Sequence, residues 1–199
     1  MTNPLPFAAA ALALLSIAEA SASERIAEQI DRIAPLVKTG ALQQLGGPDS
    51  ASEIVAGLAG RWFTLNNTVR NWELEDRSSR EHLARSIERL CADDWENIVT
   101  YSVTGPDRVH IDQRSPAGED HGSFDVVALG DGRKFNTLLE DDYILSIYGL
   151  EDAPHEQQQK VLTEMKALLE GGQEIWIPGA DVMVIRTAAE TEVWGRCPE

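Results

Sequence analysis

The residues best suited to acid–base or metal chemistry are few and scattered. The chain has four histidines, His82, His110, His121 and His155. His110 and Asp112 stand two positions apart in an alternating stretch, so on a strand both side chains point to the same face. Such a pair could act as acid and base or bind a divalent cation. No H-x-x-x-H or H-x-H spacing completes a ligand set, so the sequence predicts no metal site.

Patterns for other catalytic sites are missing from the sequence. No G-x-S-x-G nucleophile elbow, phosphate-binding loop or calcium loop occurs, so no cofactor is expected. Paired carboxylates of the glycosidase type stay open, because such pairs come from distant strands. The sequence therefore favours a non-enzymatic binding or interaction protein. The alternative is a hydrolase that uses carboxylates or the polar pair His110 and Asp112.

Tryptophan is unusually frequent for a domain of this size. The five positions are Trp62, Trp72, Trp95, Trp176 and Trp194. Each indole buries a large area and needs a partner for its N–H group, so core packing is one interpretation and an aromatic-lined pocket is the other. We expect Trp72, Trp95 and Trp176 to be the better candidates for ligand contacts. Trp194, three residues before Cys197, is expected to cover a disulfide.

The chain has two cysteines, Cys91 and Cys197. In an oxidising compartment an even pair in a small domain indicates a disulfide. The alternative is a buried free Cys91 and an exposed Cys197. Without a third cysteine or a C-x-x-C spacing, thiol-redox catalysis and a thiolate zinc site are disfavoured.

Charge and length exclude several classes of protein. The chain has 199 residues, with 17 Lys and Arg against 33 Asp and Glu, and a formal net charge of −16. This balance disfavours nucleic acid and anionic lipid, because phosphate binding needs clustered Lys and Arg. The length fits one domain with a sizeable core. We interpret the charge as a solubility property of an exported protein.

The N-terminus resembles an export signal. An apolar run over residues 7–18 is followed by Ala20-Ser21-Ala22, the small-x-small pattern of a cleavage site. The run is too short to span a bilayer, which takes about 20 apolar residues. We therefore expect residues 1–22 to be a cleaved signal peptide and the protein to be periplasmic or secreted, not integral to a membrane. An uncleaved apolar helix that packs on the domain is the alternative.

Helical and β-rich segments succeed one another along the chain. Apolar residues at helical spacing predict helices within residues 23–59, which we interpret as a helical appendage. Residues 60–199 predict a β-rich domain with hairpins around residues 104–107 and 130–132. The segment 61–74 is strand-like, further strands are expected at 98–103, 108–113, 124–129, 133–139, 143–150, 174–177, 182–187 and 192–196, and the helices expected there are 78–91 and 157–170. The fold class is α+β, with a curled antiparallel sheet or small β-barrel.

The start of this domain resembles a known family. Gly60-Arg61-Trp62 matches the G-x-W of a lipocalin first strand, and Arg186 or Arg196 matches the late Arg that stacks on that Trp. The chain thus resembles the short lipocalin-like (calycin) proteins that bacteria export. The resemblance implies a calyx for a small apolar molecule, with Trp62 closing its floor and not contacting ligand. A protein partner on the curled sheet is the other occupant that we consider.

Overall fold

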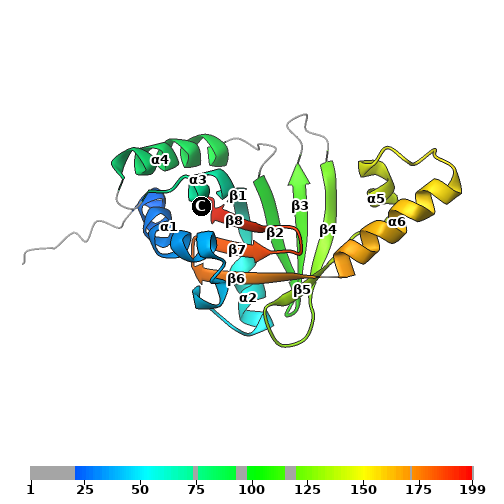
Figure 1. Ribbon diagram of the computed structural model, residues 1–199, viewed down its shortest axis with the longest axis horizontal. Coiled ribbons are helices and arrows are strands. Elements are labelled where there is room, and N and C mark those ends of the chain that lie inside the picture. Colours follow the sequence, from blue (N-terminus) through cyan, green and yellow to red (C-terminus); the bar gives the residue numbers. More distant parts are fainter. Residues whose placement is uncertain (1–20, 74–75, 93–97, 115–119, 171, 199) are drawn as a thin grey trace, which may run out of the picture.

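Eight antiparallel strands close into a barrel in the computed structural model, which describes residues 21–73, 76–92, 98–114, 120–170 and 172–198 (Figure 1). The strands are β1 (Gly60–Thr64), β2 (Ile98–Gly105), β3 (Arg108–Arg114), β4 (Asp120–Ala128), β5 (Lys134–Leu138), β6 (Gln173–Gly179), β7 (Val182–Arg186) and β8 (Thr191–Arg196). Each strand pairs with the next in sequence, and β8 returns to β1 with Trp62 opposite Arg196. The predicted α+β fold with a small barrel is confirmed.

Helices flank the barrel on two sides (Figure 1). They are α1 (Ala22–Thr39), the 3-10 turn η1 (Leu42–Gln44), α2 (Ala51–Leu58), α3 (Asn66–Arg70), α4 (Arg77–Ala92), α5 (Asp141–Ile147) and α6 (His155–Glu170). Ser21 and Glu24 form a capping box at the start of α1, and Gly40 ends this helix in the left-handed conformation. These local signals set the two ends of α1, one of the helices predicted within residues 23–59.

Strand alternation divides the apolar side chains between two cores. Inside the barrel, Trp62, Tyr101 and Ile185 belong to one buried cluster. On the outside, Phe63 and Trp176 pack with Ile30 of α1 in a second cluster, which α4 also joins. Because successive side chains of a strand point to opposite faces, one set of strands serves both cores.

The segment predicted as a helical appendage contributes to both cores. Ile54, Val55 and Leu58 of α2 are buried with the interior side chains of the barrel. Ile26 and Ile30 of α1 are fully buried against its outer face. Both helices therefore pack directly on the β-rich domain.

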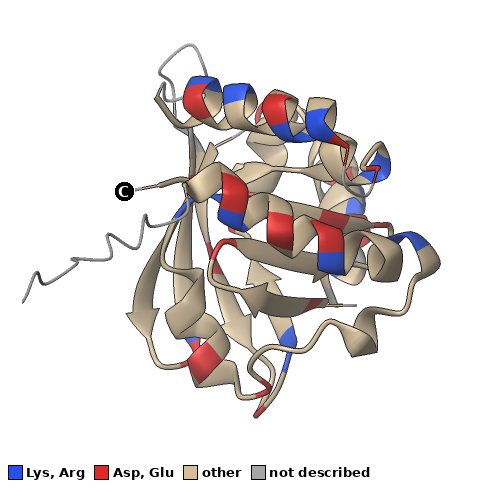
Figure 2. Ribbon diagram, turned by 90° about the vertical axis from the view of Figure 1, so that its left-hand side faces the viewer, with Lys and Arg blue, Asp and Glu red and all other residues tan. Residues whose placement is uncertain are grey.

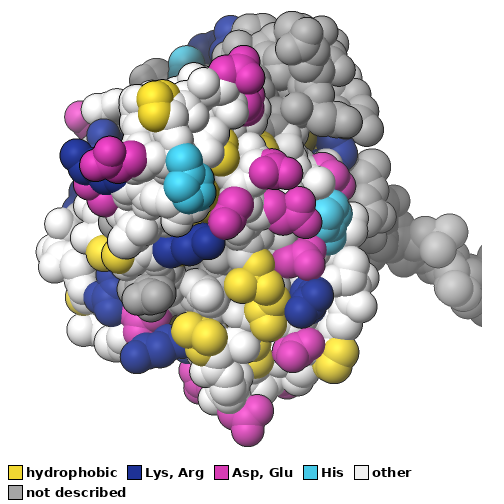
Figure 3. Space-filling model, turned by 90° about the vertical axis from the view of Figure 1, so that its right-hand side faces the viewer, with side chains coloured by type: hydrophobic (Ala, Val, Ile, Leu, Met, Phe, Trp, Pro, Cys, Tyr) yellow, Lys and Arg dark blue, Asp and Glu magenta, His cyan; other side chains and the backbone are white. Residues whose placement is uncertain are grey.

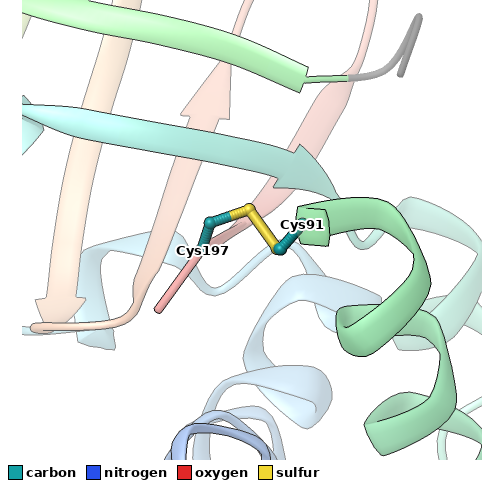
Figure 4. The surroundings of a disulfide bond; sticks show 2 residues. All are labelled: Cys91 and Cys197. Atoms are coloured by element: carbon teal, nitrogen blue, oxygen red, sulfur yellow. A yellow bond between two sulfur atoms is a disulfide. The ribbon is translucent and has the colours of Figure 1, made fainter. Parts of the chain in front are cut away.

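The predicted disulfide is confirmed. Cys91, at the end of α4, bonds to Cys197, just after β8, with an S–S distance of 2.09 Å (Figure 4). The Cys197 amide also donates a hydrogen bond of 2.8 Å to the Arg61 carbonyl of β1. The bridge thus fixes α4 beside the seam where β8 meets β1.

Two predicted strand segments are wrong. The strand-like pattern predicted over residues 61–74 is confirmed only for β1, because Asn66–Arg70 form helix α3. The apolar run 143–150 was expected to form a strand, but residues Asp141–Ile147 form helix α5. Ile144 and Leu145 are buried against Leu162 of α6, so the run buries one helical face. Asp141 and Asp142 lie in the first turn, where negative charge favours a helix N-terminus. A short apolar run alone does not distinguish a strand from a helix.

Charged residues are spread over the side of the molecule that bears α1 and α4, called here the helical side. Figure 2 shows this side, with Asp and Glu interspersed with Lys and Arg along α1 and α4. One pair, Arg80 with Asp31, joins these two helices. Among the described helices, none combines the length and apolarity that a bilayer-crossing segment requires.

Candidate functional site

One end of the barrel is closed by α2, Trp62 and Arg196. The Arg196 guanidinium lies over the Trp62 ring, 4.3 Å from its centroid. The Trp62 indole donates a 2.7 Å hydrogen bond to the Leu58 carbonyl, and Arg196 donates to the carbonyls of Gly57 and Ala59. These carbonyls end α2 and need partners outside the helix. The expected stacking of a late Arg on Trp62 is confirmed, with Arg196 as the residue.

A cavity of about 270 Å³ lies towards the other end of the barrel, beneath α5. Apolar side chains form most of its lining, and α5 contributes two of them, Tyr143 and Ile147. The lining residues are Val99, Tyr101, Ile111, Gln113, Phe124, Thr137, Leu139, Tyr143, Ile147, Gln173, Ile185, Glu192 and Trp194. Figure 3 faces the side of the molecule that bears α5 and α6, where apolar side chains lie among acidic ones. This cavity is the candidate functional site.

A half-buried carboxyl group lines the cavity. Glu192 of β8 accepts a 3.2 Å hydrogen bond from the Trp194 indole. Burial raises the pKa of Glu192 above its ordinary value, the Trp194 hydrogen bond opposes this shift, and the charge of Glu190 adds to it. Burial, together with the Glu192 charge, also raises the pKa of the Tyr101 hydroxyl. Ionised Glu192 therefore lies in a poorly solvated position.

The ring of Tyr143 covers one side of the cavity mouth. It stacks on Phe124 of β4, with ring centroids 6.5 Å apart and planes at 26°. It also lies against Gly122, where an added Cβ would be 1.8 Å from a ring carbon of Tyr143. Gly122 has φ of +126°, so both its conformation and the close ring favour glycine. Tyr143 thereby holds α5 on the barrel rim.

The tryptophans selected from the sequence lie elsewhere. Trp72 is buried on the helical side, where its indole donates a 2.8 Å hydrogen bond to Asp31. Trp176 lies in the outer core beneath α1. Neither lines the barrel cavity, and Trp95 lies outside the described residues. Trp72 instead lines a separate, more polar pocket of about 450 Å³ between α3 and α4.

The polar pair His110 and Asp112 comes together on the outer face of β3. His110 Nε2 lies 3.5 Å from Asp112 Oδ1, and His110 Nδ1 lies 2.8 Å from Asp125 Oδ1 of β4. Arg108 also pairs with Asp125, at 3.4 Å. The neighbouring Val109 and Ile111 point into the barrel, so this group faces away from the cavity. Within the described part of the chain, no cluster of three or more His, Cys, Asp or Glu could hold a metal ion.

Sequence reasoning missed the residues that line the cavity on β8. Trp194, expected to cover the disulfide, points into the barrel, and Cys197 lies on the opposite face. The alternation of side chains along β8 could have identified these residues, because Glu192, Trp194 and Arg196 lie on the same face of the strand. Once Arg196 is assigned to Trp62, the other two side chains must also face the interior.

Comparison with known proteins finds no matching family model, no matching curated protein and no matching solved structure. The class of protein is therefore defined by the fold and the site. It is a closed eight-stranded antiparallel barrel with a plugged end and a cavity, an architecture compatible with a lipocalin-like fold.

Proposed function

We propose that this chain is an exported, lipocalin-like protein that binds a small, largely apolar molecule inside its barrel. One observation carries the proposal. The barrel has a cavity of about 270 Å³ at one end, while Trp62, Arg196 and α2 plug the other. A concave, mostly apolar site with a few polar groups is the usual form of a small-molecule site.

The cavity size limits the ligand. A water molecule takes up about 30 Å³ of liquid, so 270 Å³ corresponds to about nine waters. A ligand with one aromatic ring and a short polar tail fits this volume. Ile111, Phe124 and Ile185 would remove its ring from water, and each buried methylene contributes about 0.8 kcal/mol.

Export is supported by two features. The Cys91–Cys197 disulfide is typical of oxidising compartments, and residues 1–22 have the pattern of a signal peptide. N-terminal sequencing of the protein recovered from the periplasm or medium should give a chain that starts near residue 23. A recovered chain that still begins at Met1 would contradict cleavage.

Calorimetric titration with phenethyl alcohol tests the binding site. This neutral compound has one ring and a short tail, and we expect it to bind the wild-type protein. Thr137→Trp, on the half-buried cavity wall, should abolish binding because the new ring fills the cavity. Ser102→Trp adds the same ring on an exposed position of β2 and should leave binding unchanged.

Two results would refute the proposed site. One is an absence of binding to the wild-type protein, and the other is equal binding to the Thr137→Trp variant. Circular dichroism and thermal unfolding of both variants establish that each is folded before titration.

A further inference from the structure

We infer that the ligand of this cavity is a lipophilic amine, whose ammonium group contacts Glu192 and whose apolar body lies among the aromatic rings. The inference rests on the proposed function and specifies its ligand. It stands on the composition of the cavity wall, which combines a single carboxylate with four aromatic side chains.

The carboxylate is the first part of the argument. Among the described residues that line the cavity, Glu192 is the one with a formal charge at neutral pH. A carboxylate accepts about four hydrogen bonds, and the Trp194 indole supplies one of them. A half-buried negative charge is costly without a partner of opposite charge, and the raised pKa of Glu192 reflects that cost. An ammonium group in the cavity would supply that partner.

The aromatic rings are the second part. Tyr101, Phe124, Tyr143 and Trp194 line the same cavity from β2, β4, α5 and β8. Aromatic faces attract cations through the ring quadrupole, and groups of rings are used to bind ammonium ligands. The same rings bury an apolar body, so they suit an amine attached to a ring or short alkyl chain.

Other ligand charges fit this wall less well. A carboxylate ligand would meet the like charge of Glu192 in a poorly solvated site. A neutral ligand can use the amides of Gln113 and Gln173, which donate and accept, but it leaves Glu192 without a counter-charge. The expected order of affinity is therefore amine, then alcohol, then carboxylate.

Three probes of matched size test this order. Phenethylamine, phenethyl alcohol and phenylacetate share one ring and differ in charge. In calorimetric titrations at neutral pH, we expect the amine to bind roughly tenfold more tightly than the alcohol. One hydrogen bond to a charged group contributes a binding free energy of about that size. Phenylacetate should bind more weakly than the alcohol.

A substitution separates the direct contact from the overall charge. Glu192→Gln keeps the size of the side chain and its ability to accept from the Trp194 indole, but it removes the negative charge. The amine should then bind no more tightly than the alcohol, whose own affinity should change little. Glu28→Gln removes one charge from an exposed position of α1 and should keep the full amine preference.

The outcomes distinguish this inference from the proposed function. If the alcohol binds to the wild type but not to Thr137→Trp, and the amine binds no more tightly, the amine inference is overturned and the binding site stands. An amine preference that survives in Glu192→Gln also overturns it, because the net charge of −16 would then be its source. If none of the three probes binds to the wild type, the proposed function fails, and the inference fails with it.

Discussion

Removal of the Cys91–Cys197 disulfide should lower the free energy of unfolding by about 4.8 kcal/mol at 25 °C, the value that the chain-entropy relation gives for a sequence separation of 106 residues. The perturbation is the double substitution Cys91→Ala and Cys197→Ala. The bond closes more than half of the chain into one loop, so its main effect is on the unfolded state, where the free ends gain entropy when it is absent.

The structure indicates that packing adds little to this loss. Cys197 is buried on the outer face of the barrel and Cys91 is half-buried. Alanine at both positions removes two small sulfur atoms, and the hydrogen bond from the Cys197 amide to the Arg61 carbonyl involves only backbone atoms. The seam between β8 and β1 should therefore persist in the folded variant.

Urea denaturation measures the effect. The double variant should show a lower midpoint and a steeper dependence on urea, because an uncrosslinked unfolded chain exposes more surface. A reducing agent should bring the wild type to the stability of the variant and leave the variant unchanged. A loss below about 2 kcal/mol, or a wild type that is insensitive to reduction, would refute the chain-entropy argument.

The remaining predictions concern the two ends of the barrel. Arg196→Lys should lower the free energy of unfolding by about 2 kcal/mol in urea titrations, since an ammonium cannot stack on Trp62 and reach two carbonyls together. Arg70→Lys, at an exposed position, should have little effect, and equal losses would contradict this role. For Glu192 the folded pKa is raised, so the stability that the neutral carboxyl contributes is complete below the unfolded pKa and lost as pH rises through the folded pKa. Glu192→Gln should therefore be more stable than the wild type at neutral pH, with the difference vanishing in acid, and a less stable variant at neutral pH would refute the assignment.

Local signals made much of the barrel predictable. The pair β4 and β5 follows from alternating apolar residues on either side of Gly130-Asp131-Gly132. Helix α5 was missed because its apolar run is as short as a strand, and its helical state depends on packing against Leu162 of α6. The apolar run itself contains no information about this distant partner.

The candidate site residues also differ in how far the sequence could predict them. Trp62 could be assigned from the sequence because a G-x-W pattern marks the closed end, but the late Arg stayed open between Arg186 and Arg196 until the pairing of β8 with β1 selected Arg196. Trp72 and Trp176 could not be separated from the residues that line the barrel cavity, because their burial depends on helix α1, which covers the outer face of the barrel. Strand alternation shows which residues share a face, but the register of the closed barrel decides which face is inside.

The acidic charge of the chain and the carboxylate of the cavity act over different distances. A net charge of −16 attracts cations to the whole surface, and salt weakens this attraction beyond a Debye length of about 10 Å at 0.1 M. The proposed contact between a ligand cation and Glu192 would form in a half-buried position, which salt screens much less. In the proposed complex the surface charge would therefore act on the approach of a cation, while Glu192 would determine its affinity. An amine preference that persists as salt is raised would come from the cavity and not from the charged exterior.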